Sequence, residues 1–167
     1  LAMPAALGFG LPVLFINRSV VPDAELGALA GHVRYVERET LLREADFVVS
    51  VLPSTPETKH LLNADAFAQM KPGAIVINGS RGAIVDEAAL LHALDTDQIR
   101  AAGLDVFATE PLPLESPLRT HPKVVALPHI GSATHETRHA MAEMATTNVL
   151  QVLEGARPAG WFDLARA

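Results

Sequence analysis

The chain has 167 residues, of which 49% are hydrophobic and 19% are charged, and it contains no cysteine. This composition allows a sizeable core and excludes a disordered chain, disulfide bridges and cysteine-ligated metal sites. A net charge of −6 without any cluster of lysine and arginine argues against a nucleic-acid partner.

The sequence shows no signal for a membrane. No apolar run reaches the length of about 18 residues that a membrane-spanning helix requires. The first residues lack the basic and apolar regions of a signal peptide. We therefore expect a soluble, cytoplasmic protein of about one domain, and nothing in the sequence indicates a bound metal.

Short apolar runs recur along the whole chain and are typical of buried strands. They occupy residues 13–16, 32–36, 47–52, 74–77, 99–106 and 124–127. Helical segments are predicted at 2–7 before Gly8, at 22–30 after a leading proline, at 40–45 capped by Thr40, after a cap at Asn63, at 86–94 and at 134–154. This alternation predicts an α/β fold built on a doubly wound parallel sheet.

Arg81 follows closely on the strand predicted at 74–77, within the run N-G-S-R-G. In open α/β sheets, ligands bind at the carboxyl ends of the strands. Arginine binds a carboxylate through two parallel hydrogen bonds. The position therefore favours a carboxylate-binding arginine, and the alternative is a solvated loop side chain between two turn glycines.

Two further strand ends carry reactive side chains. Glu110 comes shortly after the strand predicted at 99–106, and His129 follows the strand predicted at 124–127. Because parallel strands present their carboxyl ends at one edge, Arg81, Glu110 and His129 are expected to converge there. A histidinium protonates the alkoxide that forms when a 2-oxo acid is reduced, and a neighbouring carboxylate favours its charged form. None of these groups supplies a hydride, so a nicotinamide cofactor is implied.

Four motifs together resemble the D-isomer-specific 2-hydroxyacid dehydrogenases. They are L-P-S-T-P-E-T (52–58), I-N-G-S-R-G-A-I-V-D-E (77–87), A-G-L-D-V-F-A-T-E-P-L-P (102–113) and L-P-H-I-G-S-A-T (127–134). The resemblance implies that Arg81 binds the substrate carboxylate, that His129 is the general acid and base, and that Glu110 tunes His129. It also implies a cofactor groove lined by Leu52, Pro53, Thr58, Gly79, Ser80, Arg81, Asp105, His129 and Gly131, with Asp105 on the nicotinamide side.

The segment Asn17-Arg18-Ser19 is expected to set the dinucleotide preference. An acidic residue at this place of such a domain binds the ribose 2′-hydroxyl of NAD, whereas an arginine accommodates the 2′-phosphate of NADP. No acidic residue occurs here before Asp23. The segment therefore favours NADP, with NAD as the other possible cofactor, and resembles the glyoxylate/hydroxypyruvate reductase branch of the family.

The chain departs from the family pattern at its start. The glycine-rich G-x-G-x-x-G loop that holds the pyrophosphate is absent. We therefore expect residues 1–138 to form a Rossmann-like NAD(P)-binding domain without its first strand and glycine-rich loop. Residues 139–167 are expected to be the helix and tail that return to a missing substrate domain, so that the chain alone is not fully active. Trp161 and the apolar face of this helix, which carries Met141, Met144, Ala145, Val149 and Val152, would then form an association surface.

Two other functions remain open at this stage. One is an NAD-dependent dehydrogenase of the D-lactate or phosphoglycerate type, which would use the same side chains. The other is a non-catalytic dinucleotide-sensing module like the co-repressors that share this fold. The family resemblance further implies a homodimer in the full-length protein and a small 2-oxo or 2-hydroxy acid as substrate.

Overall fold

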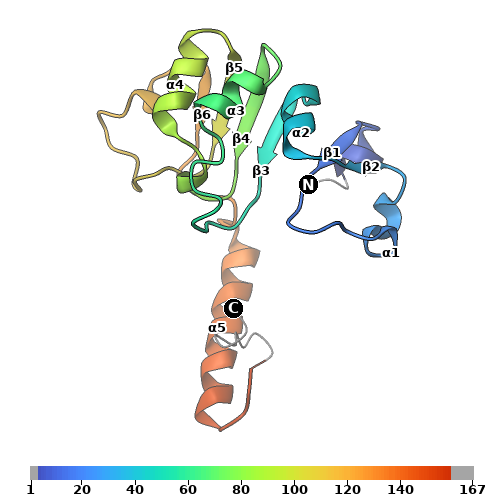
Figure 1. Ribbon diagram of the computed structural model, residues 1–167. Helices are drawn as coiled ribbons and strands as arrows, with labels where there is room; N and C mark the ends of the chain where they lie inside the picture. Colours follow the sequence, from blue (N-terminus) through green and yellow to red (C-terminus); the bar gives the residue numbers. More distant parts are fainter. Residues whose placement is uncertain (1–3, 159–167) are drawn as a thin grey trace. The chain divides into compact units, whose positions relative to one another are not determined.

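The computed structural model describes residues 4–158. The chain divides into two compact units, residues 1–128 and residues 129–167, and each is described by itself (Figure 1). The domain boundary expected after residue 138 stays a prediction, and Trp161 lies outside the described residues.

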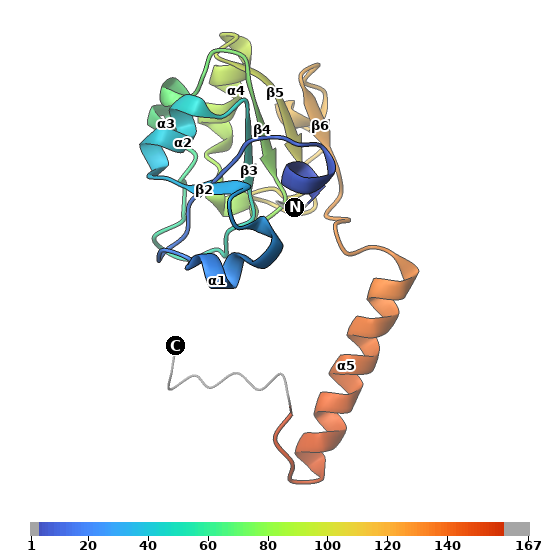
Figure 2. The same ribbon diagram turned by 90° about the vertical axis from the view of Figure 1, so that its right-hand side faces the viewer.

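Residues 4–158 contain six short strands, which all lie in the first unit and form two parallel sheets. They are β1 (Val13–Phe15), β2 (Val33–Tyr35), β3 (Phe47–Ser50), β4 (Ala74–Asn78), β5 (Ile99–Leu104) and β6 (Val124–Ala126). β1 pairs with β2, and the other four follow in the order β3-β4-β5-β6 (Figure 2). Each apolar run that predicted a strand contains one, so these predictions are confirmed. The predicted α/β fold with parallel strands is likewise confirmed, although no ladder of hydrogen bonds joins β1 or β2 to β3 among the described residues.

Five α-helices lie in the described residues, and the side chains of Asn63, Asp86 and Thr134 cap three of them. They are α1 (Asp23–Leu26), α2 (Arg38–Glu44), α3 (Ala64–Gln69), α4 (Glu87–Asp95) and α5 (His135–Leu153), the last in the second unit. Short helical turns add Pro4–Gly8, of π type, and Gly27–Leu29, Gly82–Ile84 and Pro117–Arg119, of 3₁₀ type. The Asn63 side chain caps α3 as predicted, accepting a hydrogen bond from the Ala66 backbone N–H at 3.0 Å.

Three helix predictions need correction. The helix expected over 22–30 is interrupted at Gly27, whose φ of 54° lies in the left-handed region, and it continues only as a 3₁₀ turn. The cap assigned to Thr40 is wrong, because α2 already begins at Arg38 after Glu37. The described end of the first predicted helix is a π-type turn rather than an α-helix.

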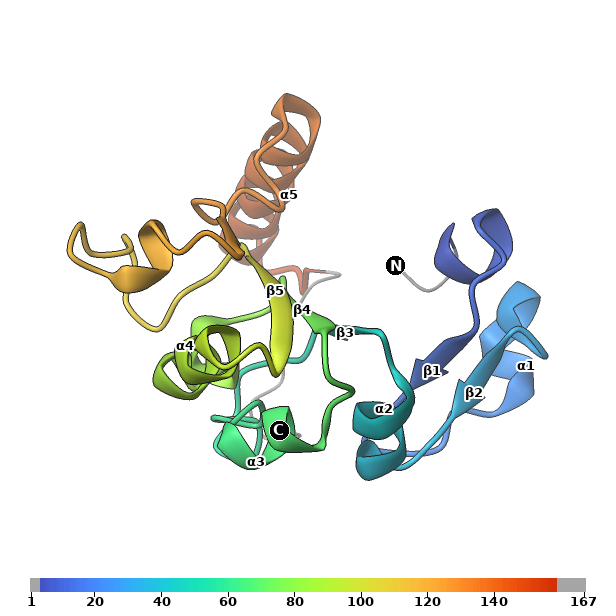
Figure 3. The same ribbon diagram turned by 90° about the horizontal axis from the view of Figure 1, so that it is seen from above.

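The core lies on one face of the four-stranded sheet. Side chains alternate along the strands, so that Val48 of β3 and Val76 of β4 point into the core. Leu42 of α2, Phe67 of α3 and Leu90 of α4 belong to the same buried cluster. Helices α2, α3 and α4 therefore cover this one face, and Figure 3 shows α3 and α4 on the same side of β4 and β5.

The opposite face of this sheet is apolar but exposed. Phe47 and Val49 of β3, Ile77 of β4 and Val125 of β6 alternate with the core residues, and all four are exposed. Register places them in rows, since Val49 pairs with Ile77 and Gly103 of β5 pairs with both Ile77 and Val125. The α/β fold is thus layered on one side only in this unit.

The described part of the second unit consists mainly of α5. Its first turn is capped by the Thr134 hydroxyl, which accepts a hydrogen bond from the Thr137 backbone N–H at 3.1 Å. The predicted apolar positions of this helix are exposed, Met141, Met144 and Val149 among them. In the described part of the chain, no helix has the length and apolar character needed to cross a membrane. The same residues contain no cluster of three or more side chains suited to hold a metal.

Candidate functional site

The four strands of the larger sheet end at the same level. Ser50, the last residue of β3, pairs with Asn78 of β4, Asn78 pairs with Leu104 of β5, and Leu104 pairs with Ala126 of β6. Hydrogen bonding continues one residue further, from the backbone N–H of Gly79, Asp105 and Leu127 to the carbonyls of Ser50, Asn78 and Leu104. The loops that follow the strands therefore leave from one edge, which is where open α/β sheets bind ligands.

Arg81 lies in the loop after β4, three residues beyond the strand. Its backbone is extended, with φ −142° and ψ 146°. Its Nη1 donates a hydrogen bond to the Ser80 carbonyl at 2.7 Å. Among residues 4–158 this is the only hydrogen bond that the guanidinium makes, so most of its N–H groups are available to a ligand carboxylate.

The segment after Arg81 is held by two neighbouring loops. The backbone N–H of His60 donates to the Ala83 carbonyl at 2.8 Å, and that of Leu62 donates to the Ile84 carbonyl at 3.0 Å. On another side, Gly82 lies directly against the loop that follows β5. A Cβ at Gly82 would be 1.9 Å from the carbonyl carbon of Phe107, so only glycine allows this approach.

Glu110 belongs to the loop that Gly82 contacts. Its Oε1 accepts a hydrogen bond from the Phe107 backbone N–H at 2.9 Å. The next N–H along, that of Ala108, donates to Oε1 of Glu87 at 2.7 Å. Two carboxylates thus fix consecutive amides of this loop, and Glu87, the first residue of α4, fastens it to the helix. The loops that carry Arg81 and Glu110 are therefore in backbone contact.

The loop predicted to face the cofactor follows β3 and is held by Thr58. The Thr58 hydroxyl donates to the Pro53 carbonyl at 2.8 Å and accepts from the Thr55 backbone N–H at 2.8 Å. This pattern closes residues 53–58 into a defined turn. Leu52 is half-buried against the core, so the loop is anchored at its start as well.

Asn17, Arg18 and Ser19 follow β1 and are all exposed. The pKa of the Glu57 carboxyl is lowered, first by its hydrogen bond with the Thr55 side chain, next by its own backbone, and also by the positive charge of Arg18. Arg18 therefore lies within electrostatic reach of the 53–58 turn. An exposed guanidinium whose charge acts on Glu57 is of a kind suited to the phosphate groups of a dinucleotide, and the residues present fit such a cofactor in this respect.

His129 and Gly131 belong to the second unit. His129 is exposed and has a φ of 54°, a conformation that is uncommon for residues other than glycine. The Ala133 backbone N–H donates to the Ile130 carbonyl at 2.9 Å, which forms a turn just before the α5 cap. The expected convergence of His129 with Arg81 and Glu110 stays a prediction, as do the individual roles of all the predicted site residues.

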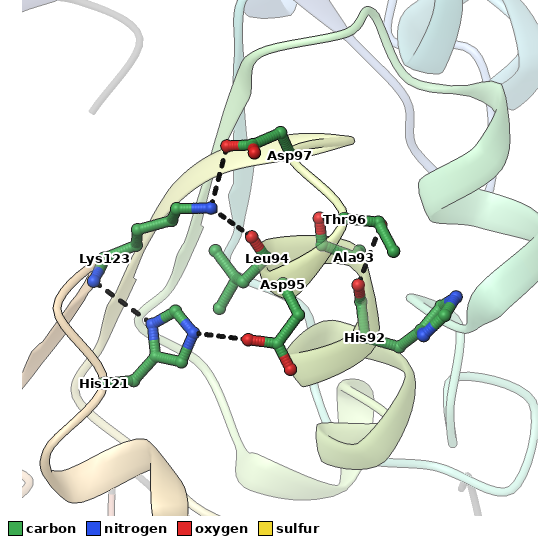
Figure 4. Close-up of polar contacts among 8 residues, drawn as sticks. All are labelled: His92, Ala93, Leu94, Asp95, Thr96, Asp97, His121 and Lys123. Carbon is green, nitrogen blue, oxygen red and sulfur yellow. Dashed lines mark hydrogen bonds and ion pairs between the residues drawn. The ribbon is translucent and has the colours of Figure 1, made fainter.

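A second polar cluster lies at the other end of the sheet, where α4 ends and β6 begins (Figure 4). His121 Nε2 lies 3.2 Å from Asp95 Oδ1, and the Lys123 backbone N–H donates to His121 Nδ1 at 3.1 Å. The Lys123 Nζ donates to Asp97 Oδ1 at 2.9 Å and also to the Leu94 carbonyl. A lysine at the last carbonyls of a helix is a favourable C-terminal cap, so this cluster fastens α4 to β6 and has a structural role.

Comparison with known proteins identifies the family. Residues 2–131 match the model for the NAD binding domain of the D-isomer specific 2-hydroxyacid dehydrogenases, which is most of the chain. The chain belongs to this family. Its members are oxidoreductases that act on CH–OH groups, and the part described above is an NAD(P)-binding domain of the Rossmann type.

Individual members of the dehydrogenase family are similar to this chain over most of its length. The chain is 54% identical over 155 residues to glyoxylate/hydroxypyruvate reductase B of Escherichia fergusonii, an alignment that covers 93% of this chain and 47% of that protein. A protein of Thermus thermophilus superposes with a TM-score of 0.83 at 44% identity, covering 92% of this chain and 46% of that one. The chain thus spans about half the length of the curated relatives that it matches.

A further solved member of the family contains a cofactor. It is a D-isomer specific 2-hydroxyacid dehydrogenase of Xanthobacter autotrophicus Py2, determined in complex with NADPH and MES. The TM-score is 0.80 at 32% identity, and the superposition covers 99% of this chain and 66% of that one. NADPH is therefore a cofactor that this fold accepts in a related protein.

Sequence reasoning missed four residues that shape this edge of the sheet: Ser50, Asn78, Gly82 and Glu87. Their roles depend on contacts between segments that are far apart in the chain, such as Glu87 with Ala108. A local signal existed for Ser50 and Asn78, each a polar residue at the end of an apolar strand. Such a residue needs hydrogen-bond partners when it is buried.

Proposed function

We propose that this chain is the NAD(P)-binding half of a reductase that converts glyoxylate or hydroxypyruvate into the 2-hydroxy acid with NADPH. The observation that carries the proposal is the position of Arg81 at the carboxyl edge of the sheet, with most guanidinium donors unused among the described residues. The chain's 54% identity to a glyoxylate/hydroxypyruvate reductase B supports this choice of substrate.

In this proposal, Arg81 binds the substrate carboxylate through two parallel hydrogen bonds, which also orients the neighbouring carbonyl. NADPH, when bound, supplies the hydride for the carbonyl carbon. His129 donates a proton to the carbonyl oxygen, and in the reverse direction it accepts that proton. Glu110 stabilises the charged imidazole of His129 and keeps it oriented. The close approach of Gly82 to the backbone at Phe107 keeps the loops of Arg81 and Glu110 next to each other.

Steady-state kinetics of the complete gene product that contains this chain test the proposal. The variant His129→Gln keeps a hydrogen-bonding side chain of similar shape but carries no transferable proton. We expect kcat for glyoxylate reduction to fall by about 100-fold or more, the usual contribution of a general acid, with NADPH binding retained. A parent protein that binds NADPH but reduces neither glyoxylate nor hydroxypyruvate would support the sensing module instead.

We also propose that Arg18 gives the protein its preference for NADPH. Its side chain is exposed after β1 and lies within electrostatic reach of the 53–58 turn. A guanidinium at this place pairs with a 2′-phosphate, whereas a carboxylate would repel it and bind the ribose hydroxyls of NADH. Arg18→Asp should therefore weaken NADPH binding more than NADH binding, as measured by fluorescence titration. An equal loss for both cofactors would contradict the assignment.

We further propose that the complete protein acts in the cytoplasm as a homodimer, with neither nucleic acid nor a membrane as partner. The exposed apolar rows on the sheet and on α5 provide surface for association. Analytical ultracentrifugation of the complete protein should give the mass of a dimer. A mass equal to one chain would contradict this part of the proposal.

A further inference from the structure

A buried polar network lies directly beneath the Arg81 loop. Asn78 is 1% exposed, Ser80 is 5% exposed and Ser50 is 6% exposed, and these are the buried polar residues of the described chain. Ser50 Oγ lies 2.9 Å from Ser80 Oγ, and Ser80 Oγ donates to Asn78 Oδ1 at 2.6 Å. The Asn78 side chain in turn donates from Nδ2 to the Arg81 carbonyl at 3.0 Å.

The direction of these hydrogen bonds follows from the protons available. Asn78 Oδ1 is only an acceptor, so the single hydroxyl proton of Ser80 points to it. Ser50 must then donate its own hydroxyl proton to Ser80 Oγ. The result is one directed chain of bonds from Ser50 through Ser80 and Asn78 to the Arg81 carbonyl, and such chains strengthen each member.

Asn78 contacts the Arg81 loop at three points. Its Oδ1 accepts from both the Ser80 hydroxyl and the Ser80 backbone N–H, the latter at 3.2 Å. Its Nδ2 bonds the Arg81 carbonyl, which also accepts from the Ile84 backbone N–H at 3.2 Å. The amide side chain therefore spans Ser80 and Arg81, and it fixes the peptide group before Ser80 and the peptide group after Arg81.

The network also joins two parts of the proposed site. Ser50 ends β3, two residues before Leu52 and the turn proposed to face the cofactor. The Ser50 carbonyl accepts from the Gly79 backbone N–H at 3.2 Å, next to the side-chain network. A core of this size does not need polar residues here, because an apolar group of the same shape in place of both partners is close to neutral for stability. The presence of these buried polar residues therefore indicates that they fix the geometry of the Arg81 loop.

We propose that Asn78 is a positioning residue for substrate binding: it fixes the backbone at Arg81 so that the guanidinium meets the substrate carboxylate. This inference rests on the proposed role of Arg81 as the carboxylate-binding residue. Asn78 does not touch the substrate, since its side chain is buried and bonded to Ser80 and Arg81. The Ser50 end of the network ties this position to the loop proposed to line the cofactor groove.

The variant Asn78→Asp tests the bond to Arg81 selectively. It keeps the shape and the acceptor for Ser80 but replaces the N–H donor by a second acceptor facing the Arg81 carbonyl. In the complete gene product we expect the KM for glyoxylate to rise by about 10- to 100-fold, since displacement of a binding group by about 1 Å costs up to about 100-fold. The KM for NADPH should change much less.

The pH dependence of this variant gives a readout that general destabilisation would not produce. When the introduced carboxyl is protonated, its O–H donates to the Arg81 carbonyl in place of the amide. The ratio of the variant's KM for glyoxylate to that of the parent should therefore fall as the pH is lowered. If Asn78→Asp does not fold, Asn78→Ala replaces it as the test, because this variant carries no buried charge. The same rise in the KM for glyoxylate is expected for it.

Gln98→Ala is the matched control. The Gln98 amide also donates to backbone carbonyls, of Phe67 at 3.0 Å and Met70 at 2.9 Å, but it lies next to the first residue of β5, at the opposite end of the sheet. Its loss should lower thermal stability and leave the KM for glyoxylate within about twofold of the parent. An equal rise in KM for Gln98→Ala would overturn the specific role of Asn78.

Hydrogen exchange measured by mass spectrometry separates this inference from the proposed function. Asn78→Ala should speed exchange in the peptide spanning residues 79–85, and Gln98→Ala should not. If the parent does not reduce glyoxylate, the proposed function fails, and the exchange experiment alone decides whether Asn78 fixes the Arg81 loop. Unchanged exchange in 79–85, or an active Asn78 variant with an unchanged KM for glyoxylate, would overturn the inference.

Discussion

Replacing Gly82 by alanine should separate the Arg81 loop from the Glu110 loop. The added Cβ would lie 1.9 Å from the Phe107 carbonyl carbon, 2.0 Å from its oxygen and 2.4 Å from the Ala108 nitrogen. Ordinary contacts of a Cβ begin at 3.4 Å, so one backbone must move by about 1.5 Å. Glu110 and Glu87 hold the backbone of these three atoms, and Asn78 holds the loop of Arg81. Movement of either loop therefore displaces a part of the proposed site.

The size of the effect follows from that displacement. A shift of about 1 Å in a substrate-binding group costs up to about 100-fold in rate, or about 2.7 kcal/mol, and overpacking costs about 1–3 kcal/mol of stability. We therefore expect kcat/KM for glyoxylate in the complete gene product to fall by about 100-fold, together with a lower melting temperature.

Gly103→Ala provides the control for this prediction, because a Cβ there meets only Ile77 Cγ1, at 3.8 Å. This variant should keep both the activity and the melting temperature of the parent. Gly82→Ala with kcat/KM and melting temperature equal to those of Gly103→Ala would refute the reasoning, since the close approach of the two loops would then not matter.

Three further substitutions test how the fold is held. Asp86→Ala removes the carboxylate that accepts from the Ala88 and Ala89 backbone N–H groups, both at 3.1 Å, and should lower the free energy of unfolding by about 1 kcal/mol in urea titrations. Thr134→Ala removes the cap of α5 and should reduce the protection of residues 135–138 in hydrogen exchange, with an unchanged pattern contradicting the cap. Leu42→Ala empties a core position that is 2% exposed and should cost about 2–5 kcal/mol, so a loss below about 1 kcal/mol would contradict its packing under α2.

The strands were predictable from sequence because their signal is local. Residues 47–50 and 74–78 are short, β-branched and bounded by polar or turn residues, and burial of alternate side chains confirms them. The ends of helices were less predictable. Thr40 has the right side chain for a cap, yet α2 starts before it at Arg38, whose guanidinium donates to the Leu61 carbonyl at 2.8 Å in a contact that sequence does not reveal.

The position of Arg81 at a strand end was predictable in the same way, but its support was not. The close approach of Gly82 to Phe107 joins segments about two dozen residues apart, and Glu87 reaches Ala108 across a similar separation. Sequence periodicity carries no information about such contacts, since they depend on how the strands align. These contacts arise because strands β3, β4 and β5 end at the same level, at Ser50, Asn78 and Leu104.

The exposed face of the four-stranded sheet is a further feature that the sequence did not predict. Phe47 and Ile77 have the apolar character of core residues, and the continuous apolar runs of their strands predict burial on both faces of the sheet. The structure instead leaves this face of the first unit exposed, while α2, α3 and α4 cover the other. Alternation within a strand assigns residues to faces, but it does not tell which face is covered.

The most direct test of the proposed site is the reduction of glyoxylate by NADPH in the complete gene product, comparing the parent with Arg81→Lys and Arg81→Gln. We predict turnover by the parent, a KM for glyoxylate raised by about 10-fold or more in Arg81→Lys and further in Arg81→Gln, and an NADPH affinity that changes much less than the KM for glyoxylate in both. The reason is that lysine retains the charge but loses the paired hydrogen bonds, and glutamine loses the charge as well. A parent without turnover, or an Arg81→Gln variant with an unchanged KM for glyoxylate, would contradict the proposed role of Arg81.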